Sequence, residues 1–571
     1  IQTNKIKVSR GGEITVTDAN LLAAESIEVG HNGNSAGKLT ENGESTITGE
    51  IKMTATTSTV ASDGGLNVTT DIADHKVVFD EVNKVYKVVP MEYKVQVGEA
   101  KYETIAEAVS AAADEATVTL LTDIIMDTKQ YVTQNDGYAV LVNVADKDVT
   151  IDLNGKIVTV NANATDLDGA KSKMLMAVFH ADPNGSLTLT DNSEAKTGKV
   201  DVMANNAKIY SFGASESKEG TEKATNGTLT IASGTYTIDN VANSMFFTDA
   251  NAKIVIDGGN FTLGNVGSGS NGSPWIFNTY GNNEINVIVN GGTFNADVNH
   301  QYWAHEVDVA KEKALQANSD GTWTVVPAVA YVVENNQNYD RNVGYATIEE
   351  AIVAVEENKT ITLVADVTYT KATGATNGDY VDGLVYTGDK NFTIDFNDKT
   401  ITDNGEINDY LVYLKNTGEK DNEITFKNGT IAVAESTAAW AAITVGANSA
   451  TCKTTLNLEG MKVVNGNPND ANNQVIRIRK GSVVNLNEGT EVTSNGTSYG
   501  VVAETTATVN INKDAKVVQT NSKTTGGNQV YTAVSGNGTI NVYDGAEIVS
   551  DNYGIHNLTT GNTVINIYGG S

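Results

Sequence analysis

The sequence predicts an all-β protein of tandem parallel β-helices, each of which begins with a short capping helix. Three observations support this prediction: a long internal duplication, helix-start motifs in both copies, and short strands that recur at nearly constant intervals. A chain of 571 residues exceeds what one hydrophobic core usually organises. The 53 glycines beside only 5 prolines suit many tight turns between strands. We therefore expect a repeat array.

The duplication aligns YETIAEAVSAAADEATVTLLTDI (102–124) with YATIEEAIVAVEENKTITLVADV (345–367) without a gap. The same offset, 345 − 102 = 243, places VTIDLNGKIV (149–158) on FTIDFNDKTI (392–401). Similarity that keeps its register over this length is typical of a duplicated structural unit.

A second marker gives the module boundaries. NKVYKVVP ends at Pro90 and DGTWTVVP ends at Pro327, and a new strand pattern follows each proline. We expect residues 1–90 to form a small β unit or the end of a preceding module, 91–327 to form β-helix module 1, and 328–571 to form β-helix module 2. No such terminator follows in module 2, so its C-terminal end is expected to be incomplete, and further modules of the same chain are expected.

Each duplicated module opens with a helix signal. Thr104 and Glu107 in the first copy, and Thr347 and Glu350 in the second, have the spacing of a capping box, in which hydroxyl and carboxylate bond the free N–H groups of a helix start. Apolar residues then recur at i, i+3, i+4 and i+7, which predicts one buried stripe on each short helix. These helices are expected to cover the first coil of their module.

The rest of each module has the two-residue period of half-buried strands. TTLNLEG, SVVNLNEG, ATVNINKD, GTINVYDG and TVINIYGG each place one asparagine between two apolar residues, and the interval from one to the next lies near one coil of a β-helix (510 − 485 = 25, 541 − 510 = 31). Stacked coils pair every strand with the next coil and bury a continuous core. We expect these asparagines to form an outward row: Asn457, Asn485, Asn510, Asn541 and Asn566.

Charge and cysteine content exclude several classes of function. Lys and Arg total 39 against 70 Asp and Glu, a formal charge of −31, so the net field repels a phosphate backbone and nucleic acid is not expected as a partner. The single cysteine, Cys452, cannot form an internal disulfide or a zinc site. No apolar run approaches the length of a membrane-spanning helix, so no membrane span is expected in this chain.

The phrases SGTYTI (233–238), DGGNFTL (257–263) and NGGTFNA (290–296), together with the Y-x-T-I-x-E-A opening, resemble surface β-helix proteins of gut bacteria. These belong to the broad pectate-lyase-like superfamily of right-handed parallel β-helices. The resemblance covers most of 91–571. It implies right-handed helices and a secreted, extracellular location at the cell surface, and its motifs specify architecture rather than chemistry, since function depends on sites grafted onto a fold.

Two groups of residues are candidates for ligand binding. Trp275, Tyr280, Tyr302 and Trp303 cluster in an irregular stretch, where exposed rings would stack on sugars; the alternative, which we favour, is that they pack a loop against the coils. Arg477 and Arg479 share one face of a strand and would suit an acidic saccharide. Solvated pairing with neighbouring carboxylates is the commoner role of such arginines.

The carboxylates give no convincing catalytic or metal centre. Asp152 and Asp395 occupy matching places in I-D-x-N, where turn chemistry is the favoured interpretation over a paired-carboxylate enzyme. The acidic stretches DLDG (166–169) and NPNDANN (467–473) offer oxygen ligands for calcium but lack the distal glutamate of an EF-hand. We expect no zinc and no required cofactor.

These observations predict a non-catalytic extracellular surface or adhesive protein, a rigid repeat stalk whose loops bind glycans or other surface proteins. Two alternatives stay open on the same scaffold: a glycan-active enzyme of the polysaccharide lyase type, and a phage-type tail fibre. A lyase would need acids and a base facing one another along a groove, and a fibre would need a self-associating apolar flank.

Overall fold

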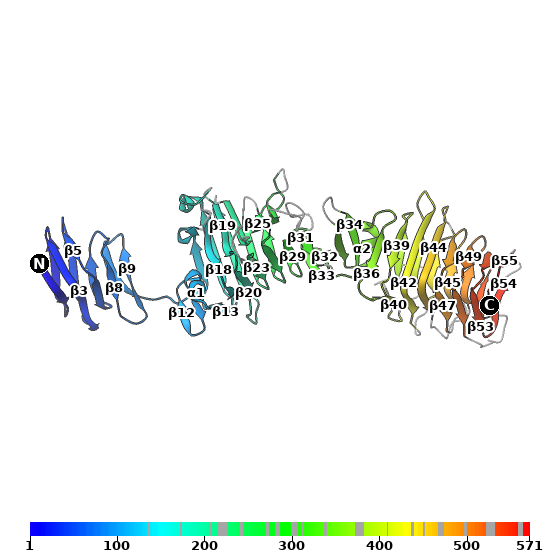
Figure 1. Ribbon diagram of the computed structural model, residues 1–571, viewed down its shortest axis with the longest axis horizontal. Helices are drawn as coiled ribbons and strands as arrows, with labels where there is room; N and C mark the ends of the chain where they lie inside the picture. The colour runs from blue at the N-terminus through cyan, green and yellow to red at the C-terminus, as the bar shows by residue number, and fades with distance from the viewer. Residues whose placement is uncertain are drawn as a thin grey trace. The chain divides into compact units, whose positions relative to one another are not determined.

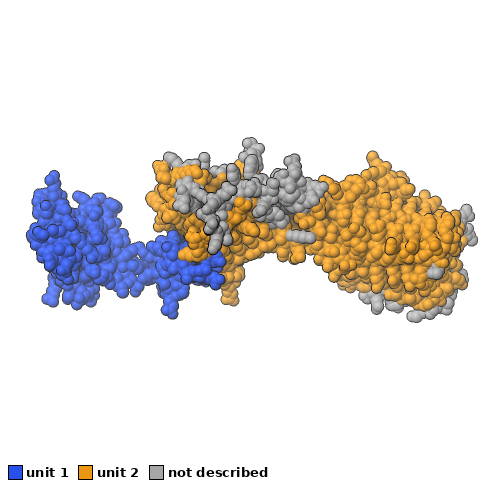
Figure 2. Space-filling view, in the orientation of Figure 1, with its two compact units in different colours: residues 1–124, 148–157 blue, residues 125–147, 158–571 orange. Residues whose placement is uncertain are grey.

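The computed structural model of the chain is all-β, with sheets of mainly parallel strands and two short α-helices among the residues it describes (Figure 1). It describes residues 1–133, 138–171, 174–205, 208–214, 226–239, 244–249, 251–269, 273–279, 286–298, 307–310, 312–335, 340–371, 382–407, 409–434, 439–448, 451–465, 473–495, 499–520, 531–557 and 563–570. The chain divides into two compact units, residues 1–124 with 148–157 and residues 125–147 with 158–571 (Figure 2).

Residues 1–90 of the first unit form two sheets of stacked strands. One sheet contains β1 (Gln2–Val8), β3 (Asn20–Gly33), β5 (Thr46–Thr48), β6 (Ile51–Ala55) and β8 (Val68–Thr70), all paired in parallel. The other contains β2 (Glu13–Thr17), β4 (Lys38–Asn42), β7 (Thr59–Ala61), β10 (Val85–Pro90) and β9 (His75–Asp80). In this second sheet β10 runs antiparallel to both β7 and β9, so the parallel stack ends in a hairpin.

The first unit continues with a second hairpin and the first helix. Its elements are β11 (Val95–Val97), β12 (Ala100–Tyr102), α1 (Ile105–Ala111), β13 (Ala116–Leu120) and β17 (Asp148–Asp152). β11 is antiparallel to β12 and β13, whereas β13 and β17 are parallel. The predicted capping box is confirmed, because Thr104 Oγ1 accepts from the Glu107 N–H and the Thr104 N–H donates to the Glu107 carboxylate, both at 3.1 Å. The predicted apolar stripe of the helix is buried.

In the second unit, the strands before residue 328 stack in three rows, here called array 1. Row one has β20 (Ser186–Thr190), β23 (Thr228–Ile231), β26 (Lys253–Ile256), β29 (Val287–Val289) and β31 (Val307–Val309). Row two has β14 (Ile124–Asp127), β18 (Ile157–Asn163), β21 (Lys199–Asn205), β24 (Thr235–Asp239), β27 (Asn260–Leu263) and β30 (Thr293–Phe294). Row three has β15 (Val132–Thr133), β16 (Ala139–Val144), β19 (Met174–Ala181), β22 (Lys208–Ala214), β25 (Ser244–Thr248) and β28 (Trp275–Thr279). Two 3₁₀ turns, η1 (Thr128–Gln130) and η2 (Ala164–Leu167), lie beside these strands.

Aromatic rings fill the core of array 1 because like residues stack directly over like. Phe246 on row three lies between Phe212 and Phe277, with ring centroids 5.2 Å away on each side. On row two Phe261 stacks on Phe294 at 4.8 Å, and it meets Phe246 at 5.7 Å. Aromatic pairs at these distances stabilise a core beyond the area that they bury.

Array 1 ends and array 2 begins with antiparallel hairpins. The WTVVP segment is β33 (Trp323–Pro327), which pairs antiparallel with β32 (Lys313–Ala317) and β30. Array 2, the strands after residue 328, opens with β34 (Ala330–Asn335), β35 (Asp340–Tyr345) and α2 (Ile348–Ala354), and β34 is antiparallel to β35 and β36. Thr347 Oγ1 accepts from the Glu350 N–H at 3.2 Å, as the capping motif predicts.

Array 2 also stacks in three rows, in parallel, and three successive strands, one from each row, are here called a coil. Row one has β36 (Thr360–Leu363), β39 (Phe392–Asp395), β42 (Asn422–Val433), β44 (Thr454–Asn465), β46 (Val483–Leu486), β49 (Thr508–Ile511), β52 (Thr539–Val542) and β55 (Val564–Ile567). Row two has β37 (Val367–Tyr369), β40 (Thr400–Asp403), the later halves of β42 and β44, β47 (Glu491–Ser494), β50 (Lys516–Gln519) and β53 (Glu547–Ser550). Row three has β38 (Leu384–Thr387), β41 (Tyr410–Lys415), β43 (Ala441–Val445), β45 (Gln474–Ile478), β48 (Tyr499–Ala503), β51 (Thr532–Gly536) and β54 (Tyr553–Asn557).

The predicted asparagine row is a hydrogen-bonded ladder on row one of array 2. Each Nδ2 donates to the Oδ1 of the asparagine one coil earlier, at 2.7 or 2.8 Å. The apolar residues on either side of each asparagine point to the opposite face of the sheet. On β44, β46, β49 and β52 these apolar residues are buried. At the start of the ladder Asn457 donates to Glu423 Oε1 at 2.6 Å. The ladder therefore fixes the register of consecutive coils, because a slip by one residue would break every bond in it.

The duplication repeats its hydrogen bonds as well as its residues. Asn154 Nδ2 donates to the Leu120 carbonyl at 2.9 Å, and Asn397 Nδ2 donates to the Leu363 carbonyl at 3.3 Å. The two asparagines are 397 − 154 = 243 residues apart and the two leucines are 363 − 120 = 243 residues apart, which is the offset of the sequence duplication. The I-D-x-N motif thus serves the same bend between coils in both copies.

Candidate ligand-binding pocket on array 2

Row three of array 2 is the row whose connections vary in length. The bends from row one to row two are uniform over the last coils, at 487–490, 512–515 and 543–546. The connections that leave row three differ from coil to coil, from 446–453 after β43 to 537–538 after β51. Loops that change in length on a constant scaffold are where binding groups usually lie, so binding groups are expected along row three.

The two arginines predicted as ligand-binding residues lie on β45 and just after it. Arg477 points to the outer face of row three, where its Nε donates to Glu504 Oε1 at 2.7 Å and its Nη2 lies 2.6 Å from the same oxygen. Arg479 is only 9% exposed, and its Nη2 donates to the Tyr410 hydroxyl at 2.7 Å. The guanidinium of Arg479 also lies 5.6 Å from the centre of the Tyr410 ring, a cation–π distance.

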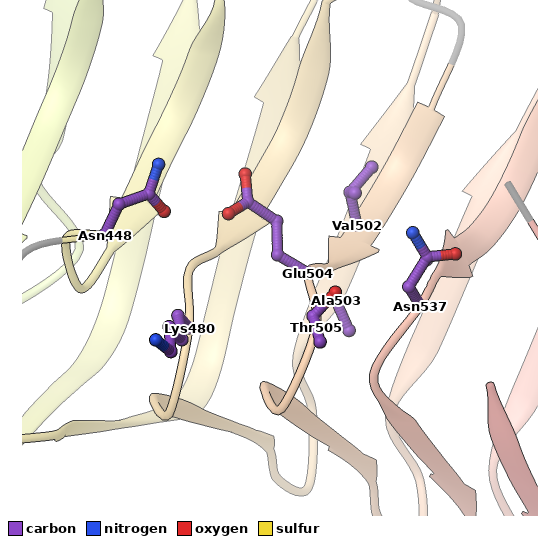
Figure 3. Close-up of a pocket in the computed structure, with 8 residues that line it drawn as sticks. Asn448, Lys480, Val502, Ala503, Glu504, Thr505 and Asn537 are labelled. Atoms are coloured by element: carbon purple, nitrogen blue, oxygen red, sulfur yellow. The ribbon is translucent and has the colours of Figure 1, made fainter. Parts of the chain in front are cut away.

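A shallow pocket of about 340 Å³, here called the corner pocket, lies beside this pair (Figure 3). It occupies the bend that follows four successive strands of row three, β43, β45, β48 and β51. In Figure 3, Glu504 lies between Asn448 and Asn537 across the coils. Polar side chains from four coils and a small apolar floor line it: Asn448, Lys480, Val502, Ala503, Glu504, Thr505, Gly536 and Asn537.

Several polar groups of the corner pocket are available to a ligand. Asn448, Lys480 and Thr505 are exposed and have no hydrogen-bond or ion-pair partner within the described ranges. Both contacts of Arg477 to Glu504 use Oε1, so Oε2 is left without a protein partner among the residues that the structure describes. The arginine holds the carboxylate in one position, and the pocket offers an ammonium, a hydroxyl, the amide of Asn448 and a carboxylate oxygen together.

Another pocket, of about 490 Å³, lies beside α2, and the lysine that lines it already has protein partners. Its lysine, Lys390, donates through Nζ to the carbonyls of Ile352, Val353 and Val355 at 2.7 to 3.1 Å. These are the unpaired carbonyls of the helix C-terminus, and a lysine there satisfies them and the helix dipole. Lys390 therefore serves the capping helix, whereas Lys480 has no such role.

Of the predicted aromatic cluster, the structure places one residue. Trp275 is the first residue of β28 on row three of array 1 and is 8% exposed, so its ring has little free face for a sugar. Tyr280, Tyr302 and Trp303 lie outside the described residues.

The carboxylates singled out in the sequence take part in bends. Asp152 Oδ1 accepts from the Asn154 N–H at 2.9 Å, and Asp395 Oδ1 accepts from the Asn397 N–H at 3.0 Å, which is the geometry of an Asx turn. In the 166–169 stretch Asp166 accepts from the Thr128 hydroxyl at 3.0 Å. Most of 467–473 lies outside the described residues. Across the described ranges there is no group of three or more His, Cys, Asp or Glu side chains placed to hold a metal ion.

A polar cluster on row three of array 1 was not predicted from the sequence. His180, which is 1% exposed, has its Nδ1 at 3.0 Å from Asn143 Oδ1 and at 3.4 Å from Asp182 Oδ1. Burial alone would raise the pKa of Asp182, but hydrogen bonds from His180 and Asn143 outweigh it and lower that pKa below its ordinary value. The cluster joins the neighbouring strands β16 and β19 of row three.

The sequence already contained a signal for the corner pocket. The spacing of the asparagine row gives one coil length as 510 − 485 = 25, and adding it to position 480 gives 505, so Lys480 and Thr505 were predictable neighbours. Asn448 and Asn537 were not predictable in this way, because the connections before β45 and β51 are longer than those of the neighbouring coils.

The chain matches no protein-family model, and no curated protein is significantly similar to it. Among the described residues, no helix has the length and apolar character needed to cross a bilayer.

Proposed function

We propose that this chain is a non-catalytic extracellular surface protein, in which right-handed parallel β-helices form rigid supports for a binding face. The observation that carries the proposal is the in-register stacking of three strand rows, with an asparagine ladder outside and a continuous apolar core inside. Such an array gains stability from each added coil, and it presents the bends of successive coils as one fixed surface.

The binding part of the proposal rests on row three of array 2. Its connections vary in length, its outer face carries a fixed Arg477–Glu504 pair, and exposed polar side chains line the bend beside it. The resemblance of the coil phrases to surface proteins supports the extracellular location.

The purified chain is expected to bind one or more saccharides or surface proteins and to release no product from any saccharide. The measurement combines a glycan and protein binding array with reducing-end and unsaturated-sugar assays on the same polysaccharides. As a control, the assays include Asp395→Asn and Glu504→Gln, which change a bend carboxylate and the pocket carboxylate. Product release by the unmodified chain that either substitution abolishes would contradict a non-catalytic role.

A further inference from the structure

We propose that the corner pocket binds an extended, uncharged saccharide chain that lies across the coils of array 2. This inference rests on the proposed function and deepens it by naming the ligand class and the residues that hold it. The spacing of the coils matches that of sugars. Neighbouring strands lie about 4.8 Å apart, which is similar to the length of one pyranose unit in an extended chain. Three successive coils therefore offer polar side chains for successive sugars: Asn448 on the first, Lys480 on the second, and Glu504 and Thr505 on the third.

The polar groups of the pocket suit sugar hydroxyls. A sugar hydroxyl both donates and accepts, so it needs acceptors and donors side by side. Glu504 Oε2 is an acceptor held in place by Arg477, Lys480 supplies N–H donors, and Thr505 and the amide of Asn448 supply both functions. Val502, which is 7% exposed, gives a small apolar floor for the C–H face of a ring. Together these groups suit a ligand with vicinal hydroxyls on a ring better than they suit a ligand with a single charged group.

The charge and topology of the chain disfavour other classes of ligand. The net charge of −31 and the carboxylate of Glu504 oppose a polyanionic glycan or a nucleic acid. A peptide that adds a strand needs a free strand edge, but β45 and β48 are paired on both sides and β43 and β51 continue the same row. A compact apolar ligand would need a deeper pocket with more apolar lining.

The experiment measures binding of the full chain to neutral oligosaccharides (gluco-, galacto-, manno- and xylo-oligomers), to a polyuronate and to unrelated peptides. We expect a neutral oligosaccharide to bind, with affinity about tenfold lower in Lys480→Ala and about fivefold lower in Asn448→Ala, from the loss of one charged or one neutral hydrogen bond. The matched control is Lys462→Ala, an exposed lysine of row two in the same array, which should bind as the unmodified chain does.

All three substituted positions are exposed, so each variant is expected to keep the fold. An unchanged melting temperature checks this for each variant. Binding of a neutral oligosaccharide that both pocket variants leave unchanged would overturn the corner-pocket assignment while leaving the proposed function standing. Binding only of the polyuronate or only of peptides would overturn it as well. Cleavage of the bound saccharide would overturn the proposed function instead.

Discussion

Replacing Phe246 with alanine is expected to lower the free energy of unfolding of array 1 by about 3 to 5 kcal/mol, the usual cost of removing a buried phenylalanine ring. Phe246 is fully buried and touches the rings of Phe212, Phe261 and Phe277, so its removal opens a cavity that three coils share. In a stack where each coil depends on its neighbours, the loss should spread to the strands on both sides.

The measurement is hydrogen exchange of β22, β25 and β28, followed together with denaturant unfolding. The next residue, Phe247, is the matched control, because it lies on the outer face of the same strand and is only half-buried. Phe247→Ala is expected to lower the free energy of unfolding less and to change the exchange of these three strands less. Equal losses of stability in the two variants would show that the stacked rings are not the core of this array.

Gly536→Ala is expected to destabilise array 2 by about 3 kcal/mol, through backbone strain and overpacking. Gly536 has φ = 142°, and a Cβ there would lie 1.9 Å from the carbonyl oxygen of Ala503 on the neighbouring strand. Because that contact is with backbone, no side-chain rotation relieves it, and β48 and β51 must move apart.

Gly481→Ala provides the comparison, since Gly481 also has a positive φ of 79° but has no atom within 4 Å of an added Cβ. It should lose only the conformational preference of glycine, about 1 kcal/mol. Denaturant unfolding of the two variants, measured in parallel, separates the steric effect from the backbone effect. A Gly536→Ala loss no larger than that of Gly481→Ala would mean that the coils are not as closely spaced as described.

The sequence predicted best what depends on local pattern. The capping box at Thr104, the N-cap bond of Thr347 and the strands around the asparagine row follow from short spacings, and the structure confirms them. Sequence reasoning did not predict the antiparallel hairpins that end and begin the arrays. The V-V-P segments read as terminators, but their partner strands β9 and β32 carry no comparable motif.

Long-range pairing also explains what was missed in the candidate pocket. Arg477 and Arg479 are two residues apart, so the sequence predicted that both lie on one exposed face of a strand. Arg479 is instead buried, and its guanidinium donates to the Tyr410 hydroxyl. Tyr410 belongs to β41, two strands away in the same row. Glu504, the partner of Arg477, lies 27 residues further on, and this distance becomes meaningful only when the coil length is known. Local pattern cannot supply contacts that depend on the lengths of irregular connections.

The central claim is that consecutive coils stack in register, with each asparagine of the row directly beside the next. Its most direct test is disulfide formation between cysteines at Asn510 and Asn541, which are register partners, in a chain that also carries Cys452→Ser. Adjacent strands place such partners about 4.8 Å apart, within the range of Cα separations of a disulfide. The account predicts rapid intramolecular oxidation of this pair and none for cysteines at Asn485 and Asn541, which β49 separates. Failure of the first pair to oxidise, or equal oxidation of both pairs, would contradict it.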